Sequence, residues 1–325
     1  MRSFEFHRAT SLGEALSLLA VPGSHPLAGG TTIIDLMKLG VESPAALVDI
    51  GSLPLGGIEL TGDVLRIGAL ASNSAVAADP IVRSAFPVIS EALLSGASGQ
   101  IRNAASMGGN LLQRTRCAFF RSHDWPCNKR EADSGCPAQE GANAHHAVLG
   151  TSERCLAVNP SDLAVALLAL DAVVGIRSRE TTREVPLADF YRLPGITPHV
   201  ETVMRPGELI THIDVPKSRV GPKSTYLKLR GRASYEFASA SVAAAVRCEE
   251  GLVAEVAVAL GGLGTVPWRD RQAEALLLGQ PLNDETIAVF CRALLAPARP
   301  TEANRYKLDL ARGAIHRTLM RSASC

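Results

Sequence analysis

The sequence predicts an α+β chain of two domains, the second built on a three-stranded antiparallel sheet with helices. Three observations support this class. The chain has 325 residues, enough to bury more than one core. Segments of strand and helix periodicity alternate as far as residue 216, and a polar stretch with Gly and Pro follows at 216–223. Three strand-like segments and then three helical ones complete the chain. We therefore expect domains at 1–217 and 223–325, the first divided into subdomains of about 1–55 and 56–217.

The first subdomain is expected to be a small α/β unit. Phe4 and Phe6 alternate with polar neighbours as in a short strand. Ser11 followed by Glu14 predicts a capping box at the start of a helix, which ends at Pro22-Gly23. A second helix is expected near 35–39 and a strand at 46–50.

The second subdomain is expected to begin with a hairpin and to contain an apolar helix. Gly62-Asp63 is a two-residue turn between strands at 58–61 and 64–67. Ser161 is a candidate cap for a helix that runs through Leu170, with Asp162 in its first turn. The other expected elements of the chain are helices at 74–78, 87–94, 271–278, 284–295 and 304–320 and strands at 172–178, 183–187, 209–215, 225–229, 241–247 and 252–260.

Composition and charge exclude several classes of partner. The 33 Lys and Arg residues balance 32 Asp and Glu residues, so no polyanion is implied and nucleic-acid binding has no support. Apolar residues make up 46% of the chain, but no run approaches the roughly 20 residues that cross a bilayer, so no membrane contact is expected. The first residues lack the apolar core of a signal peptide, so export would depend on a partner subunit.

Two glycine runs are candidate binding turns. One is Pro26-Leu27-Ala28-Gly29-Gly30-Thr31-Thr32-Ile33-Ile34, and the other is Ser106-Met107-Gly108-Gly109-Asn110. Paired glycines allow the backbone to approach a diphosphate closely, and neighbouring hydroxyls and free amides can donate hydrogen bonds. Most Gly-Gly pairs are only tight turns, so these runs alone support a nucleotide site weakly.

A loop-like insert at about 115–156 contains Cys117, Cys127, Cys136 and Cys155. Thiolates hold zinc or iron-sulfur clusters, and either would crosslink a polar loop. The successive spacings of 10, 9 and 19 give no close Cys-x-x-Cys pair of the usual zinc type. Two disulfides are the other interpretation, although the chain has seven cysteines and no export signal. From the residues alone, cluster and disulfides are about equally supported. Cys248 and Cys291 are predicted to be buried core thiols.

These motifs carry a resemblance that covers nearly the whole chain. The residues involved are Pro26 to Ile34, Ser106 to Asn110, Pro160-Ser161-Asp162, Pro206 to Ile210, and Lys228. Together they resemble the FAD-binding medium subunit of the molybdenum hydroxylases, the family of xanthine dehydrogenase and carbon monoxide dehydrogenase. Most members lack the cysteine insert, and with it the chain is similar to the FAD and 4Fe-4S subunits of bacterial periplasmic aldehyde oxidases.

The resemblance implies a two-part FAD-binding domain followed by a C-terminal flavoprotein domain, with no catalytic residue on this chain. It implies four 4Fe-4S ligands, Cys117, Cys127, Cys136 and Cys155. The FAD-binding residues it implies are Pro26, Leu27, Ala28, Gly29, Gly30, Thr31, Thr32, Ile33, Ile34, Ser106, Gly109, Asn110, Asp162, Ile210 and Lys228.

Individual positions have ordinary alternatives beside these implied roles. By resemblance, Lys228 lies near the flavin ring, where its charge would favour the anionic reduced form. It could equally be an exposed strand lysine, and Asp162 could serve only to offset the helix dipole. Phe190 and Tyr191 are weaker candidates for packing against the ring. Arg116, Arg121, Lys129 and Arg130 would offset the negative charge of a cluster or simply solvate the loop.

The implied function is electron transfer within a heterotrimer. A large subunit would hold the molybdenum cofactor and oxidise an aldehyde, and a small subunit with two 2Fe-2S clusters would pass electrons through FAD to an external acceptor. The alternatives are the equivalent subunit of an aromatic acyl-CoA reductase and a zinc- or disulfide-stapled binding module without a redox role. The compartment is periplasmic if a signal-bearing partner exports the complex, and otherwise cytoplasmic. The cluster is a relay or a structural staple.

Overall fold

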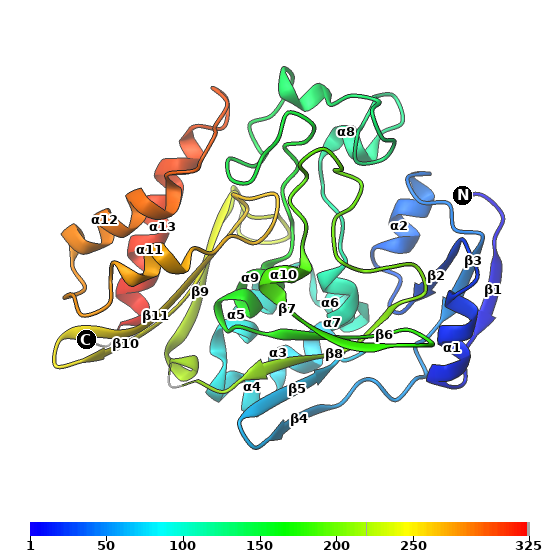
Figure 1. Cartoon of the computed structure of the whole chain (residues 1–325), viewed down its shortest axis with the longest axis horizontal. Helices are drawn as coiled ribbons and strands as arrows, with labels where there is room; N and C mark the ends of the chain where they lie inside the picture. Colours follow the sequence, from blue (N-terminus) through cyan, green and yellow to red (C-terminus); the bar gives the residue numbers. More distant parts are fainter. Residues whose placement is uncertain (219, 324–325) are drawn as a thin grey trace.

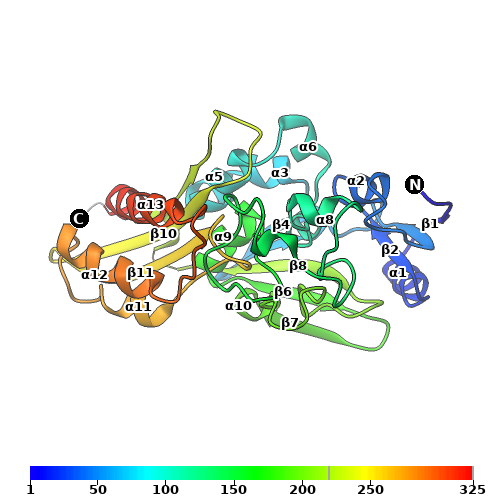
Figure 2. The same ribbon diagram turned by 90° about the horizontal axis from the view of Figure 1, so that it is seen from above.

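The computed structural model describes residues 1–218 and 220–323. Figure 1 shows the N-terminal elements at one end of the long axis and the C-terminal helices at the other, and Figure 2 shows the same order from above. A five-stranded sheet and its helices lie between them. No described helix is both long enough and apolar enough to cross a bilayer.

The N-terminal unit is a parallel sheet of order β1-β3-β2 with two helices. Its core is formed by apolar side chains of the first helix and the central strand, with Leu209 from the larger sheet. Its elements are β1 (Glu5–Arg8), α1 (Leu12–Leu19), β2 (Ser24–Leu27), α2 (Ile33–Lys38) and β3 (Ala46–Asp49).

The middle of the molecule is an antiparallel sheet of order β4-β5-β8-β6-β7, covered by helices. The largest core packs α3, α5 and α9 against this sheet. The strands are β4 (Ile58–Thr61), β5 (Val64–Gly68), β6 (Val173–Arg177), β7 (Thr182–Pro186) and β8 (Leu209–Pro216). The helices are α3 (Asn73–Ala78), α4 (Pro80–Ala85), α5 (Pro87–Ser95), α6 (Gly99–Ala104), α7 (Met107–Leu111), α9 (Asp162–Ala169) and α10 (Leu187–Phe190).

The C-terminal elements form the antiparallel sheet β11-β10-β9 with helices on it, which confirms the expected fold. Its core also takes in Val148 and Leu149 from the end of the cysteine insert. The elements are η2 (Gly221–Lys223), β9 (Ser224–Leu229), β10 (Ala240–Glu249), β11 (Leu252–Gly261), α11 (Arg271–Ala275), α12 (Asp284–Leu295) and α13 (Tyr306–Ser322).

The cysteine insert has little regular structure. Between α7 and α9 it contains only α8 (Ala118–Arg121) and the short 3-10 helix η1 (Pro137–Gln139). Figure 1 shows this segment above the centre of the molecule. The prediction of a loop is therefore confirmed, and side-chain contacts must hold the segment in place.

Two local predictions need correction. The Ser11 hydroxyl accepts from the backbone N–H of Glu14, but the Glu14 carboxylate accepts from Thr10, so the capping box is incomplete. A complete box instead begins α12, at Asn283 and Thr286. Cys291 is a buried free thiol as predicted. Cys248 is only partly buried, because β10 turns toward the surface at its end, and it is disulfide-bonded and not a free thiol.

Candidate functional site

The fold brings the two glycine runs together. A cavity of about 300 Å³ lies between α2 and its preceding turn on one side and α7 on the other. Ser106 caps α7 by accepting from the backbone N–H of Gly109 at 3.2 Å. The residues of the implied set that line this cavity are Pro26, Ala28, Gly29, Gly30, Thr31, Thr32, Ile33, Ser106, Gly109 and Ile210.

The glycines at 29 and 30 are needed for reasons within the fold. A Cβ on Gly29 would lie 1.7 Å from the carbonyl oxygen of Ala104, so the first subdomain closes on the second at this point. Gly30 has φ of +71°, a left-handed conformation that favours glycine. The sequence argument assigned both glycines to close approach of a diphosphate. The structure shows that Gly29 first allows close approach of another backbone.

A second cavity, of about 560 Å³, continues from the first. The two share Thr31, Thr32 and Gly109. Asn110, Asp162 and Lys228 line the second cavity, so segments far apart in the sequence meet along one cleft. Leu27 and Ile34 line neither cavity. We call the two cavities together the flavin cleft.

Asp162 and Lys228 form a buried ion pair in this cleft. The Lys228 ammonium donates to the Asp162 carboxylate at 2.7 Å, and the two side chains are only 4% and 10% exposed. The Tyr226 hydroxyl donates to the other carboxylate oxygen at 2.7 Å. Lys228 is therefore not an exposed strand lysine, and Asp162 does more than offset a helix dipole. Because the two charges cancel, the pair presents little net charge to a flavin.

Two unpaired polar atoms test whether the cleft suits FAD. The side-chain oxygen of Asn73 and Nε of Arg116 are buried without a hydrogen-bond partner, and both residues line the second cavity. Buried polar atoms are nearly always paired. A nucleotide cofactor with ribityl hydroxyls and phosphate oxygens would supply both an O–H donor and an acceptor here, so the residues present fit FAD. Sequence reasoning missed Asn73, and only its unpaired oxygen identifies it.

The four insert cysteines lie close together as free thiols. Their sulfurs are near one another, since, beside burial, the charge of a neighbouring insert cysteine contributes to the raised pKa of Cys117, Cys136 and Cys155. Among the described residues, no three of these sulfurs lie within 4.8 Å of one another. Sulfurs on one tetrahedral zinc ion, at Zn–S of about 2.3 Å, would lie about 3.8 Å apart. The spacing is therefore wider than that of a mononuclear zinc site.

Burial raises the pKa of three of these thiols. The pKa of Cys155 rises to about 11 for this reason, although nearby Lys129 opposes the shift. Burial likewise raises the pKa of Cys117 and Cys136. A metal centre must displace these protons, since thiolates are the ligands, and its positive charge would supply the driving force.

The cations of the insert are engaged with partners, so solvation is not their main role. Arg116 and Arg121 both pair with Asp35 of α2, at 3.3 and 2.7 Å. Lys129 donates to the carbonyl oxygen of Pro198 at 3.0 Å. Arg130 donates to backbone carbonyls of Phe119, Phe120 and Trp125.

His146 is the second functional candidate that sequence reasoning missed. Its Nε2 lies 3.2 Å from the sulfur of Cys117, and the residue is only 8% exposed. Burial, with a smaller effect of Lys307, lowers the pKa of His146 to about 4, so the ring is neutral near pH 7. His145 and His146 are adjacent in a polar loop, and such histidines usually lie in solvent. The sequence pattern alone therefore gave no reason to single out His146.

A third cavity connects the cleft to the insert. It has a volume of about 620 Å³ and is lined by Asp162 and Arg116 on the cleft side and by Cys117 and His146 on the insert side. The buried hydroxyl of Ser241, which has no hydrogen-bond partner, also lines it. The cleft and the cysteine centre are therefore neighbours across one space.

The two aromatic candidates for ring packing lie elsewhere. Phe190 is fully buried in the main core, and Tyr191 packs edge-on against it with centroids 5.0 Å apart. The Tyr191 hydroxyl donates to the carbonyl oxygen of Leu111. Neither residue lines the flavin cleft, so their role is in the core.

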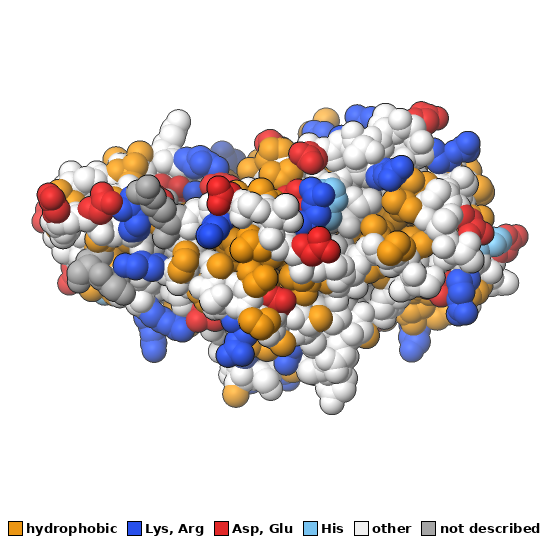
Figure 3. All heavy atoms as spheres, turned by 90° about the horizontal axis from the view of Figure 1, so that it is seen from below, with side chains coloured by type: hydrophobic (Ala, Val, Ile, Leu, Met, Phe, Trp, Pro, Cys, Tyr) orange, Lys and Arg blue, Asp and Glu red, His pale blue; other side chains and the backbone are white. Residues whose placement is uncertain are grey.

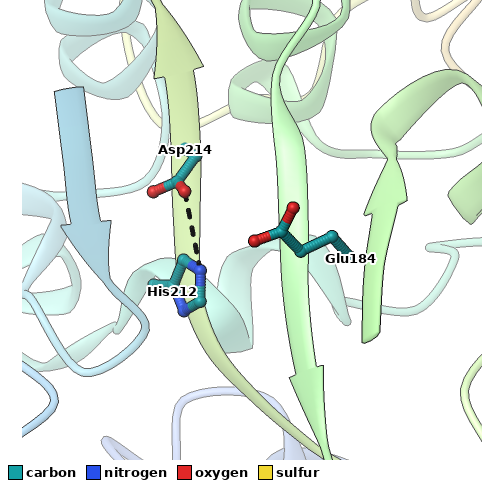
Figure 4. A group of neighbouring side chains, drawn as sticks. All are labelled: Glu184, His212 and Asp214. Carbon is teal, nitrogen blue, oxygen red and sulfur yellow. Dashed lines mark ion pairs between the residues drawn. The ribbon is translucent and has the colours of Figure 1, made fainter. Parts of the chain in front are cut away.

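Glu184, His212 and Asp214 form a further group with metal-type side chains, shown in Figure 4. They lie on strands β7 and β8, which flank β6, and a Cβ on Gly175 of β6 would meet the His212 ring. Both oxygens of Asp214 already accept from Arg66, at 2.8 and 2.6 Å. The nearby guanidinium opposes a bound cation, and we interpret the group as an ion-pair network of the sheet.

Comparisons with known proteins agree with this geometry. The family described as FAD binding domain in molybdopterin dehydrogenase matches residues 2–218, and the CO dehydrogenase flavoprotein C-terminal domain matches residues 225–322. Aldehyde oxidoreductase FAD-binding subunit PaoB of Escherichia coli is 48% identical over 315 residues, which is 96% of each chain. The glyceraldehyde dehydrogenase medium chain of Sulfolobus acidocaldarius is 28% identical, over 93% of this chain and 90% of its own.

A solved structure shows the same fold. Carbon monoxide dehydrogenase from Hydrogenophaga pseudoflava contains a chain that superimposes with a TM-score of 0.76 at 26% identity, covering 99% of this chain and 97% of that one. The family matches span both domains, and the glycine runs and the buried Asp162–Lys228 pair lie along one cleft. The chain therefore belongs to the family of FAD-binding medium subunits of the molybdenum hydroxylases, oxidoreductases whose molybdenum site is on another chain.

Proposed function

We propose that this chain is the FAD- and 4Fe-4S-containing electron-transfer subunit of a heterotrimeric molybdenum-dependent aldehyde oxidase or dehydrogenase. Its partners are a large molybdenum-cofactor subunit and a small 2Fe-2S subunit. The aldehyde assignment rests on the relative named aldehyde oxidoreductase, at 48% identity. Family membership argues against a non-redox binding module. An aromatic acyl-CoA reductase subunit remains the alternative, and no feature of the described residues favours it.

One observation supports the proposal most directly, namely the cavity that contains both Asp162 and Cys117. This cavity supports the proposal because it joins the flavin cleft to four thiols that are free of disulfides, two of them buried and two partly buried. A cluster of several irons needs sulfurs farther apart than one zinc ion does, which agrees with their spacing. Cys117, Cys127, Cys136 and Cys155 are the proposed ligands.

Bound in the cleft, FAD would accept two electrons and pass them to an external acceptor. The residues of this chain bind and orient it. The glycine turns and the Ser106-capped helix fix the backbone along the first cavity. The Asp162–Lys228–Tyr226 group is held rigidly, because Asp162 accepts from both partners at 2.7 Å and Lys228 also donates to the carbonyl oxygen of Ser95 at 3.3 Å. The group can therefore orient the flavin ring, and because the Asp162–Lys228 pair is neutral overall, it places little net charge next to that ring.

The chain also has surface features of a subunit. Exposed large apolar side chains include Trp125 of the insert and Leu193 and Ile196 of the loop after α10. Figure 3 shows hydrophobic side chains gathered toward the middle of the face seen from below, with charged side chains around them. Permanent complexes bury interfaces of about 2,000 Å² or more, rich in such side chains. We propose a periplasmic location if a partner carries the export signal, and a cytoplasmic one otherwise.

Cofactor analysis of the purified complex tests the proposal. We expect noncovalent FAD, together with iron and acid-labile sulfide beyond the two 2Fe-2S clusters of the small subunit. Zinc in place of that additional iron would contradict the cluster, and the absence of flavin would contradict the cleft. The two results are separate, so the FAD assignment and the cluster assignment can each be contradicted alone.

Stopped-flow reduction by an aldehyde then tests the role of the cluster. We propose a structural role, which rapid reduction competent with turnover would overturn.

A further inference from the structure

We propose that His146 is a positioning residue for the cysteine centre, donating a hydrogen bond from Nε2–H to the sulfur of Cys117 and thereby setting the reduction potential of the cluster. The inference rests on the proposed function, since it requires a cluster on Cys117. It assigns a role to a histidine that lies outside the set of four ligands.

The geometry determines which nitrogen of His146 carries the proton. Nε2 lies 3.2 Å from the Cys117 sulfur. Nδ1 is buried and has no hydrogen-bond partner. A neutral imidazole has one N–H, and a thiolate sulfur has no proton to donate. With Cys117 as a ligand, the contact is satisfied only by the tautomer that carries its proton on Nε2.

The C-terminal domain holds this ring in place through the backbone of the insert. The ammonium of Lys307, at the start of α13, donates to the carbonyl oxygens of His145, His146 and Gly262 at 3.1, 3.0 and 2.8 Å. The side-chain amide of Asn304 donates to the carbonyl oxygen of Ala147 at 3.3 Å. The ring therefore keeps its distance from Cys117 without any contact at Nδ1.

His146 is distinguished from the other donors around the sulfurs. The sulfur of Cys155 accepts from the backbone N–H of Ala157, a contact that every residue type can supply. Among the described residues, His146 is the side chain that hydrogen-bonds the sulfur of an insert cysteine. Hydrogen bonds to the sulfurs of a cluster withdraw electron density and raise its potential. A side-chain donor makes that potential dependent on one replaceable residue.

The first experiment is an EPR-monitored redox titration of the purified complex. His146→Leu removes the donor, and we expect the midpoint potential of the 4Fe-4S signal to fall. His146→Gln keeps an N–H at a similar reach and should restore part of the shift. His145→Leu is the matched control, because His145 is the exposed neighbour, and it should leave the potential unchanged. Equal potentials in the wild type and the His146→Leu variant would overturn the inference.

The second experiment takes its main result from the wild-type complex, so that result does not depend on the stability of a variant. Pulsed EPR of the reduced wild-type complex, with 15N in histidine only, should show a weak coupling between the cluster and one ring nitrogen. His146→Gln should remove it. No coupling, or the strong coupling of a nitrogen bound directly to iron, would overturn the hydrogen bond. A complex without the additional iron and sulfide would overturn the proposed function itself, and this inference with it.

Discussion

The flavin cleft and the cysteine insert are built in opposite ways. The cleft is lined by short regular elements, including the starts of α2, α7 and α9 and the strand β9. The insert has almost no regular structure, and ion pairs and hydrogen bonds to three other parts of the chain hold it in position. The contrast shows that backbone geometry shapes the cleft, whereas side-chain contacts hold the insert in position.

The contacts of the insert reach every part of the molecule. Arg121 pairs with Asp35 in the N-terminal unit, Lys129 pairs with Glu201 in the middle, and Lys307 holds His146 from the C-terminal helix. Cys117 and Cys127 pack with Leu36 of α2 in a small apolar cluster. An insert held in this way depends on each of these contacts, whereas the glycine turns of the cleft depend on backbone geometry. Substitutions in the insert and in those turns should therefore have different effects.

The largest effect is expected from removing a proposed cluster ligand. Cys127→Ser should abolish the additional iron and the 4Fe-4S EPR signal, because a hydroxyl is a poor ligand at a buried sulfur site. FAD content should stay near normal, since Cys127 does not line the flavin cleft. Cys291→Ser is the control at a buried cysteine of the C-terminal core and should change neither signal. Full iron content in the Cys127→Ser variant would remove Cys127 from the ligand set.

The second effect concerns the closure of the cleft. Gly29→Ala should cost about 3 kcal/mol and eliminate FAD retention, because its Cβ would meet the Ala104 carbonyl oxygen at 1.7 Å. The iron content of the insert should change less. Gly13→Ala in α1 is the control, since no atom lies within 4 Å of its added Cβ, and it should stabilise the helix slightly. Absorbance of bound flavin after gel filtration measures the result. Normal flavin in the Gly29→Ala variant would show that the two subdomains can separate here without harm.

The third effect is smaller and confined to the insert. Lys307→Met removes three hydrogen bonds to backbone carbonyls and leaves those acceptors buried, at a cost of about 2 kcal/mol. Hydrogen exchange at 143–149 should become faster by a corresponding factor of about 30. Arg305→Met changes an exposed cation two positions earlier and should have no effect. Unchanged exchange in the Lys307→Met variant would mean that the apolar contacts of Val148 and Leu149 are sufficient.

The same contrast explains what the sequence could predict. The elements of the cleft have local signals, such as the Ser161 cap of α9, which the structure confirms. The approach of Gly29 to Ala104 joins residues 75 positions apart and leaves no local pattern. The interpretation of Lys228 from strand alternation allowed an exposed side chain, because alternation does not reveal that helix α9 covers that face with Asp162.

In the insert, the sequence predicted the cysteines but not the residues that hold them. His146 and Lys307 are 161 positions apart, and each looks ordinary in its own segment. Sequence spacing also could not decide between disulfides and a metal centre. The free thiols and the wide separation of their sulfurs favour a cluster, and that comes from three-dimensional arrangement alone.

The smallest effect compares two helix caps, one at the cleft and one far from it. Ser106 caps α7 at the wall of the flavin cleft, and Asn283 caps α12 in the C-terminal domain. Replacing either by Ala should cost about 1 kcal/mol of stability. If the cap stabilises the FAD-bound form of α7, its loss should make the free energy of FAD binding less favourable by the same amount. Ser106→Ala should then weaken FAD binding about fivefold, since 1.4 kcal/mol corresponds to a factor of about 10.

Asn283→Ala should leave FAD affinity unchanged, because α12 does not line the cleft. Fluorescence release of FAD during dilution measures both variants on one scale. Equal affinity in the two would mean that α7 keeps its shape without the cap, held by the backbone bonds from Met107 to Ala71 and from Gly108 to Ala69. In that case the wall of the cleft would be fixed by its contacts with the turn that follows β5, and the local capping signal would contribute only to folding.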